Sequence, residues 1–294
     1  MGAAPRPSSG LLTLASLALA VAVTTAHAHH QTVHRILFIG NSLTAANDLP
    51  EIVRSLAQSA GDRLDYRSVT FPDHSLEDHW NRPEARRTIA QGQWTTVVLQ
   101  QGPSALPESQ RLLREYTRRF DEEVRRIGAR TALYMVWPSD ARRRDFPGVS
   151  ASYTAAARDV GGLLMPAGDA WLAAWRRDRN MPLYSNDGFH PSVTGSYLAA
   201  LVIVQRLTGR TPLWLSATLA TSRLSLQIPA NQARVLQEAA AEATATASTQ
   251  PLANWGNMEE RVVFFSSARC GADRGIGYDR VRNHPFGDRS RPAC

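Results

Sequence analysis

Lysine is absent from this chain of 294 residues, so all 33 of its basic residues are arginine. The formal net charge is +7 at neutral pH. Such an Arg- and Ala-rich composition is typical of a GC-rich genome, and the arginines are spread along the chain instead of forming one basic segment. No nucleic-acid-binding motif accompanies them. We therefore expect no nucleic-acid partner.

Cysteine is almost as scarce. The two cysteines, Cys270 and Cys294, both lie in the last 25 residues. In an exported protein they could form a disulfide, and two separate thiols in a loosely ordered tail are an equal alternative. The sequence leaves both possibilities open.

A long hydrophobic run is also missing. The most apolar stretch, Leu11–Val23, is too short and too interrupted to span a bilayer. It follows a single charge at Arg6 and precedes Ala26-His27-Ala28, which fits a small-x-small cleavage site. We therefore predict that residues 1–28 are a signal peptide. The mature protein is then secreted or periplasmic, with no stable membrane insertion after cleavage; an uncleaved anchor is the alternative.

What the chain does contain is a regular alternation of apolar and amphipathic segments. The five expected strands cover residues 35–39, 62–71, 95–100, 131–137 and 163–166. Helical patterns separate them, which predicts βαβ units, a mostly parallel five-stranded sheet and helices on both faces. We expect one α/β domain over residues 29–249. Residues 250–294 are rich in Arg, Gly and Pro and are expected to form a poorly ordered tail.

One stretch, Arg35–Thr44, joins a predicted buried strand to a turn. Four apolar residues run directly into Gly40-Asn41-Ser42, and glycine allows a sharp turn at the end of a strand. Ser42 then lies just beyond the carboxyl end of the strand, where open α/β sheets bind their ligands. This placement suits a nucleophile. The alternative is a serine that merely caps the next helix.

A second stretch supplies the groups that a nucleophilic serine requires. Acyl transfer by serine needs a base, a group that orients the base, and donors for the oxyanion. Asp187 and His190 lie in one short loop, so Asp187 can reach back to the imidazole ring and His190 can accept the Ser42 proton. The alternative is a helix-capping aspartate beside a solvent-facing histidine.

Together these two stretches resemble the SGNH or GDSL-type serine hydrolases, which are esterases and lipases of flavodoxin-like, three-layer α/β fold. Gly40-Asn41-Ser42-Leu43-Thr44 is similar to their first sequence block, with Asn in place of Asp, and Asp187-Gly188-Phe189-His190-Pro191 is similar to their last. The resemblance covers about residues 34–210. It implies that Ser42 is the nucleophile, His190 the general base and Asp187 its orienting partner. It implies neither metal nor organic cofactor.

The middle blocks of that family are altered here. The family has a glycine after the second strand, whose N–H serves the oxyanion, and this chain has Phe71-Pro72-Asp73-His74-Ser75. Pro72 has no N–H, so Asp73 is the expected backbone donor beside that of Ser42, with His74 as a further candidate. The family's asparagine after the third strand is not evident, and Gln101, or with less support Gln100, is the expected side-chain donor. Losing one such donor costs roughly 100- to 1,000-fold in rate.

Three functions follow in order of preference. The first is a secreted hydrolase of carboxylic esters, which by resemblance acts on small-molecule or carbohydrate esters with a short acyl group such as acetyl. The second is a non-catalytic protein of the same fold that binds glycans or another ligand, because the oxyanion blocks are altered. The third is a metal-dependent hydrolase with Asp187 and His190 as ligands. A metal site near Asp73, His74, Asp78 and His79 is less favoured than a polar surface role for them.

Overall fold

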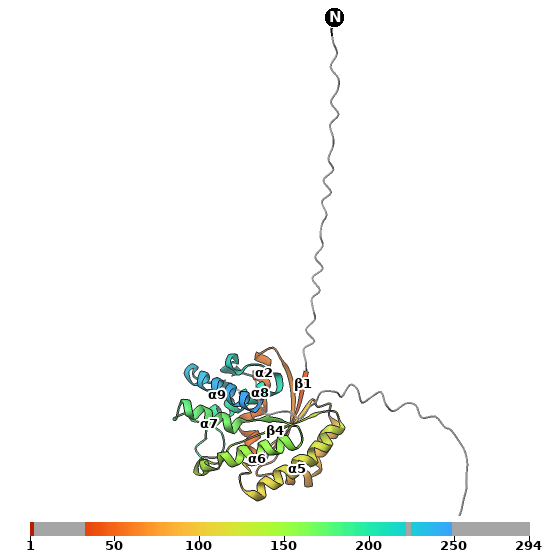
Figure 1. Ribbon diagram of the computed structural model, residues 1–294, viewed down its shortest axis with the longest axis vertical. Coiled ribbons are helices and arrows are strands. Elements are labelled where there is room, and N and C mark those ends of the chain that lie inside the picture. The colour runs from red at the N-terminus through yellow and green to blue at the C-terminus, as the bar shows by residue number, and fades with distance from the viewer. Residues whose placement is uncertain (3–32, 222–224, 249–294) are drawn as a thin grey trace, which may run out of the picture. The chain divides into compact units, whose positions relative to one another are not determined.

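The computed structural model describes residues 1–2, 33–221 and 225–248 (Figure 1). The predicted signal peptide beyond residue 2 and the predicted tail, which contains both cysteines, lie outside the described residues. Within the described part of the chain, no helix has the length and apolar character needed to cross a membrane.

A five-stranded parallel sheet forms the centre of the domain, with strand order β2-β1-β3-β4-β5. The strands are β1 (Val33–Gly40), β2 (Arg63–Thr70), β3 (Thr96–Leu99), β4 (Arg130–Tyr134) and β5 (Leu163–Met165). All five match the strands expected from the sequence. β4 is shorter than predicted: its pairing with β3 ends at Leu133 and its pairing with β5 ends at Tyr134.

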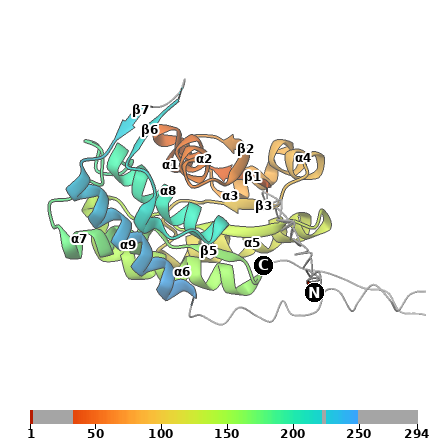
Figure 2. The same ribbon diagram turned by 90° about the horizontal axis from the view of Figure 1, so that it is seen from above.

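Helices cover both faces of the sheet, so the predicted three-layer α/β fold is confirmed (Figure 2). On one face α2 (Leu49–Ser59) packs against α8 (Val193–Thr208), and α7 (Ala167–Arg177) and α9 (Ala230–Ser248) pack against α8 and each other. The other layer comprises α3 (Leu76–Asn81), α4 (Pro83–Gln91), α5 (Pro107–Arg126) and α6 (Phe146–Asp159).

A small antiparallel hairpin was not predicted. Its strands, β6 (Thr218–Ala220) and β7 (Ser225–Gln227), have three residues each. Each strand buries only its central leucine, so the apolar alternation is too short to be recognised in the sequence.

The first strand is the core of the sheet and places the site. Residues 36–39 of β1 are fully buried, as expected for a parallel strand covered on both faces. β1 lies between β2 and β3, so the chain crosses to opposite sides of β1 in successive connections. The loops after β1, β2 and β3 therefore meet at one end of the sheet, where this class of fold binds ligands.

Candidate active site

Ser42 begins the four-residue helix α1 (Ser42–Ala45) immediately after β1. Asn41 is the N-cap, and its Oδ1 accepts a hydrogen bond of 3.1 Å from the Leu43 N–H. This bond fixes the residue before Ser42, so the serine is held at the start of a short helix directly after β1.

The side-chain amide of Gln100, which follows β3, holds the turn at Asn41 in place through hydrogen bonds. Gln100 is fully buried. Its Oε1 accepts from the Asn41 N–H at 2.8 Å and from the Thr44 hydroxyl at 2.7 Å. Its Nε2 donates to Asn41 Oδ1 at 3.0 Å and to the Gln101 carbonyl at 2.6 Å. Both acceptor positions and both N–H groups are thus used, which leaves Gln100 no donor for a substrate.

The hydrogen bond between Gln100 and Thr44 leaves no room for a side chain at Gly40. A Cβ atom added there would lie 2.4 Å from Gln100 Oε1 and 2.5 Å from Thr44 Oγ1. Such distances are shorter than van der Waals contact, and both neighbours are held by hydrogen bonds. The glycine of the first block therefore makes room for Gln100 at the end of β1.

The structure brings together the three residues that the sequence singled out. His190 Nε2 lies 2.9 Å from Ser42 Oγ, and His190 Nδ1 lies 2.6 Å from Asp187 Oδ2. A neutral imidazole protonated at Nδ1 satisfies both contacts, because it donates to the carboxylate and accepts from the hydroxyl. The geometry is that of a Ser-His-Asp triad. The catalytic roles themselves stay a prediction.

Asp187 is held as a carboxylate by its donors, although it is half-exposed. The hydrogen bond with His190 is the largest influence, followed by those from the Phe189 N–H, at 2.9 Å, and the Ser185 hydroxyl, at 2.7 Å. These donors keep the pKa of Asp187 well below its usual range. These contacts therefore favour the ionised carboxylate over the neutral acid.

The loop that carries His190 is anchored at several points. Trp137 is fully buried and donates from Nε1 to the Phe189 carbonyl at 3.1 Å. The Asp140 N–H donates to the Gly188 carbonyl at 2.7 Å, and Gly188 adopts a left-handed φ of 66° that favours glycine. Asn47 donates from Nδ2 to the Pro191 carbonyl and to Ser196 Oγ, both at 2.9 Å. Asn47 therefore links the segment after Ser42 to the segment after His190.

The predicted oxyanion donors have different surroundings. Ser42 is the first residue of α1, so its N–H has no partner within the helix. Asp73 has a left-handed φ of 58°, a conformation that favours glycine and that aspartate tolerates. Across the residues that the structure describes, neither N–H is engaged in a hydrogen bond. Both are available to a ligand.

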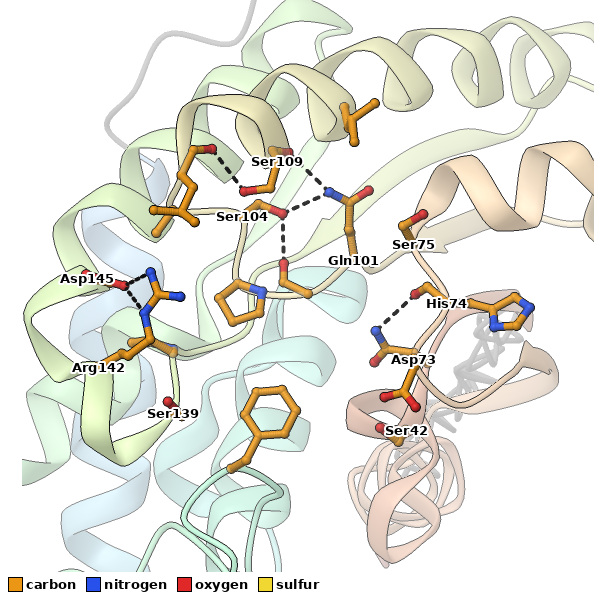
Figure 3. Close-up of a pocket in the computed structure, with 18 residues that line it drawn as sticks. Ser42, Asp73, His74, Ser75, Gln101, Ser104, Ser109, Ser139, Arg142 and Asp145 are labelled. Atoms are coloured by element: carbon orange, nitrogen blue, oxygen red, sulfur yellow. Dashed lines mark hydrogen bonds and ion pairs between the residues drawn. The ribbon is translucent and has the colours of Figure 1, made fainter.

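The side chain of Gln101 is engaged elsewhere. Its Nε2 donates to Ser104 Oγ at 2.9 Å and to the Ser109 carbonyl at 3.2 Å, and its Oε1 accepts from the Leu76 N–H (Figure 3). Both amide hydrogens are occupied in this structure. A direct role for Gln101 at the oxyanion stays a prediction and would require these bonds to be exchanged.

His79 differs from the surface role expected for it. It is 1% exposed, and its Nε2 donates to the Gly40 carbonyl at 2.8 Å. Its ring lies 5.7 Å from that of Phe71 and 5.5 Å from that of His74, centroid to centroid. Burial lowers the pKa of His79. The prediction of a surface role for His79 was wrong, because a single histidine in the sequence gives no indication that it is buried.

Two hollows meet at Ser42. The larger, about 460 Å³, extends from Ser42 and Asp73 past Gln101 and Ser104 to Arg142 and Asp145 (Figure 3). The smaller, about 300 Å³, is lined by His190 and by small or apolar residues. Those residues are Ala45, Ala46, Thr70, Phe71 and Pro72, together with Asn41. In the described part of the chain no cluster of three or more His, Cys, Asp or Glu residues is arranged to hold a metal ion.

Comparison with solved structures identifies the class of protein. The chain is similar to a DUF4886 family protein from Bacteroides uniformis, with a TM-score of 0.62 and 18% identity over 73% of this chain and 95% of that one. It is also similar to a candidate SGNH hydrolase from Slackia heliotrinireducens, with a TM-score of 0.51 and 28% identity over 60% and 99%. A lipase/acylhydrolase from Enterococcus faecalis matches with a TM-score of 0.49 and 19% identity over 64% and 100%.

The similarity to the candidate SGNH hydrolase, at 28% identity, confirms the resemblance to SGNH/GDSL hydrolases. The match to the DUF4886 family protein confirms the α/β fold. No protein-family model and no curated protein matches the sequence. The similarity is therefore established through structure.

Proposed function

We propose that this protein is a secreted serine hydrolase that cleaves carboxylic esters through an acyl-enzyme. The observation that carries the proposal is the hydrogen-bonded chain from Ser42 Oγ through His190 to the Asp187 carboxylate. The availability of the Ser42 and Asp73 N–H groups beside the serine supports it. The candidate SGNH hydrolase among the structural neighbours supports the same reaction class.

The reaction begins with proton transfer from Ser42 Oγ to His190 Nε2 as Oγ attacks the ester carbonyl carbon. The two N–H groups stabilise the negative charge that develops on the carbonyl oxygen. The bond to the alcohol oxygen then breaks, and the alcohol leaves with the proton from His190. Water attacks the acyl-serine, with His190 as base, and releases the acid and free Ser42. Asp187 keeps the imidazole in the required tautomer throughout.

The proposed substrates are short-acyl esters, such as acetyl esters, of carbohydrates. The larger hollow supports this, because serine side chains at positions 75, 104, 109 and 139 lie along it beside apolar contacts. A mixed lining of this kind suits a ligand with both hydroxyl groups and apolar faces. The proposed export of the protein, which rests on residues 1–28, would place it where extracellular carbohydrates are found.

A fluorophosphonate probe tests the reaction class, because it labels only a serine that a neighbouring base activates. We expect covalent labelling of the purified wild-type protein and no labelling of Ser42→Ala. The wild-type protein should also release 4-nitrophenol from 4-nitrophenyl acetate, and Ser42→Ala should not. The matched control is Ser59→Ala, since Ser59 lies exposed at the end of α2 and bonds only to the Leu56 carbonyl. Esterase activity that survives Ser42→Ala would exclude the proposal.

One observation favours the second candidate, a ligand-binding protein without catalysis. Gln101 already donates both amide hydrogens to protein acceptors, so the third oxyanion donor of the family has no evident counterpart. A folded protein that is not labelled, and that binds an acetylated oligosaccharide unchanged, would support this candidate. Hydrolysis that is lost on adding a chelator would instead support the metal-dependent reading.

A further inference from the structure

The Asp73 carboxylate occupies an unusual place for a negative charge. Asp73 is exposed, and both it and Ser42 line the larger hollow. Figure 3 shows its side chain directed toward Ser42. Among the described residues its carboxylate forms no hydrogen bond or ion pair. An unpaired carboxylate therefore lines the same hollow as the proposed nucleophile.

The other charges of the two hollows do not offset it. Arg142 is the only permanent cation that lines either hollow, and its guanidinium donates from Nε to Asp145 Oδ2 at 2.6 Å. This pair lies at the end of the larger hollow away from Ser42 (Figure 3). Arg82 packs over the ring of Phe71 and lines neither hollow. The lining thus carries two carboxylates and one guanidinium, and the uncompensated charge is that of Asp73.

The sign of this charge is opposite to that of the chain as a whole, which is +7. A net positive protein attracts anions over a distance, whereas the carboxylate acts on the part of the ester next to the reacting atoms. The backbone at Asp73 requires a left-handed residue, and glycine or asparagine would meet that need without charge. The turn alone therefore does not account for the carboxylate.

We propose that Asp73 is a specificity-determining residue, which makes the site favour uncharged and cationic esters over anionic ones. This inference rests on the proposed function. For carbohydrate esters it predicts that acylated neutral or amino sugars are preferred over acylated uronic acids. A unit charge a few ångströms from an exposed carboxylate corresponds to roughly a three- to tenfold preference at low salt.

Matched esters that differ only in charge test the proposal. The alcohol side is tested with phenyl acetate, 4-acetoxybenzoate and (4-acetoxyphenyl)trimethylammonium. The acyl side is tested with 4-nitrophenyl hydrogen fumarate and its uncharged methyl ester, because the trans double bond keeps the carboxylate away from the reacting carbonyl. Each kcat/KM is divided by the rate constant for imidazole-catalysed hydrolysis of the same ester, because imidazole is uncharged and does not itself discriminate by ester charge. We expect the wild-type protein to disfavour the anions three- to tenfold, and the preference to shrink as NaCl is raised from about 0.05 to about 1 M.

Asp73→Asn removes the charge and keeps a side chain that tolerates the left-handed backbone, so it should hydrolyse charged and neutral esters at nearly equal corrected rates. Asp73→Gly should behave in the same way. It provides a second uncharged variant in case Asp73→Asn does not fold. Glu122→Gln is the control, because it removes an exposed carboxylate from α5 outside both hollows; it should leave the preference unchanged.

The outcomes separate the inference from the proposed function. Hydrolysis of the neutral esters with the same charge preference in wild-type protein and Asp73→Asn would overturn the inference and leave the function intact. No charge preference on either side of the ester would also overturn it. No hydrolysis of any ester by the folded wild-type protein, together with no fluorophosphonate labelling, would overturn the function itself.

Discussion

The amide of Gln100 uses its whole hydrogen-bonding capacity on the turn that carries Ser42 and on the next residue of its own loop. It does not touch Ser42 through any of these bonds. Its effect is on Asn41, whose N–H and side-chain oxygen it fixes together. A side chain that would be taken for an oxyanion donor from its position after β3 is instead part of the support beneath the nucleophile.

Replacing Gln100 by leucine should therefore reduce both stability and activity. The apolar side chain has a similar length but leaves the Asn41 N–H and the Thr44 hydroxyl buried without an acceptor. Because each unsatisfied buried group costs about 1–3 kcal/mol, we expect the free energy of unfolding to fall by roughly 3 kcal/mol. Urea denaturation measures this. The control is the exposed Gln91→Leu on α4, which should change it by less than about 0.5 kcal/mol.

At the scale of elements, α3 is joined to the end of β1 by one buried histidine. His79 donates to the Gly40 carbonyl while its ring packs near Phe71 and His74, so it connects the turn before Ser42 with the loop that contains Asp73. Its Nδ1 is buried and forms no hydrogen bond among the described residues. A protonated ring would place a positive charge in this buried position.

The stability of the protein should therefore depend on pH through His79. Burial lowers its pKa in the folded state, so the unfolded chain binds a proton more readily. This contribution is fully present above the unfolded pKa of about 6.5 and is lost as the pH falls toward the folded pKa, at no more than about 1.4 kcal/mol per pH unit. Urea denaturation at pH 8, 6.5 and 5.5 measures the free energy of unfolding. As the pH falls, this free energy should decrease less in His79→Gln than in the wild-type protein. Equal losses in the two proteins would contradict this assignment.

Much of this architecture could be predicted from sequence because its signals are local. Apolar runs that end in Gly40 or in Gln100-Gln101 mark strands and their ends, and the Asp187–His190 spacing marks the loop. The three-residue strands of the β6–β7 hairpin carry too little pattern to be recognised. The roles of Gln100, His79 and Asn47 depend on partners far away in the chain, so no local pattern identifies them.

At the scale of the whole molecule, the site is assembled from two segments that lie far apart in the sequence. Ser42 and His190 are 148 positions apart, and Asn47 and Pro191 are 144 apart. Asn47 has a left-handed φ of 54°, and its side-chain amide donates hydrogen bonds to the Pro191 carbonyl and to Ser196 Oγ in the segment after His190. It therefore holds the distance between the nucleophile segment and the histidine loop.

Asn47→Gly should reduce activity more than stability. Glycine accepts the left-handed backbone without strain, while the bonds to Pro191 and Ser196 are lost. Small misplacements of a catalytic group cost up to about 100-fold, so we expect kcat with 4-nitrophenyl acetate to fall by roughly tenfold or more. Ser196→Ala, which keeps the bond to Pro191, should lower it by less than about threefold. Equal kcat values for Asn47→Gly and the wild-type protein would show that the link has no role in positioning.

The left-handed backbone at Asp73 has a consequence for how such a site can change over generations. Few residues adopt that conformation readily, chiefly glycine, asparagine and aspartate. A single nucleotide substitution converts an aspartate codon into a glycine codon or an asparagine codon. The loop can thus gain or lose its negative charge in a single mutational step while its shape is preserved. Ester preference at this position can then diverge among descendants without any change in the triad or the sheet.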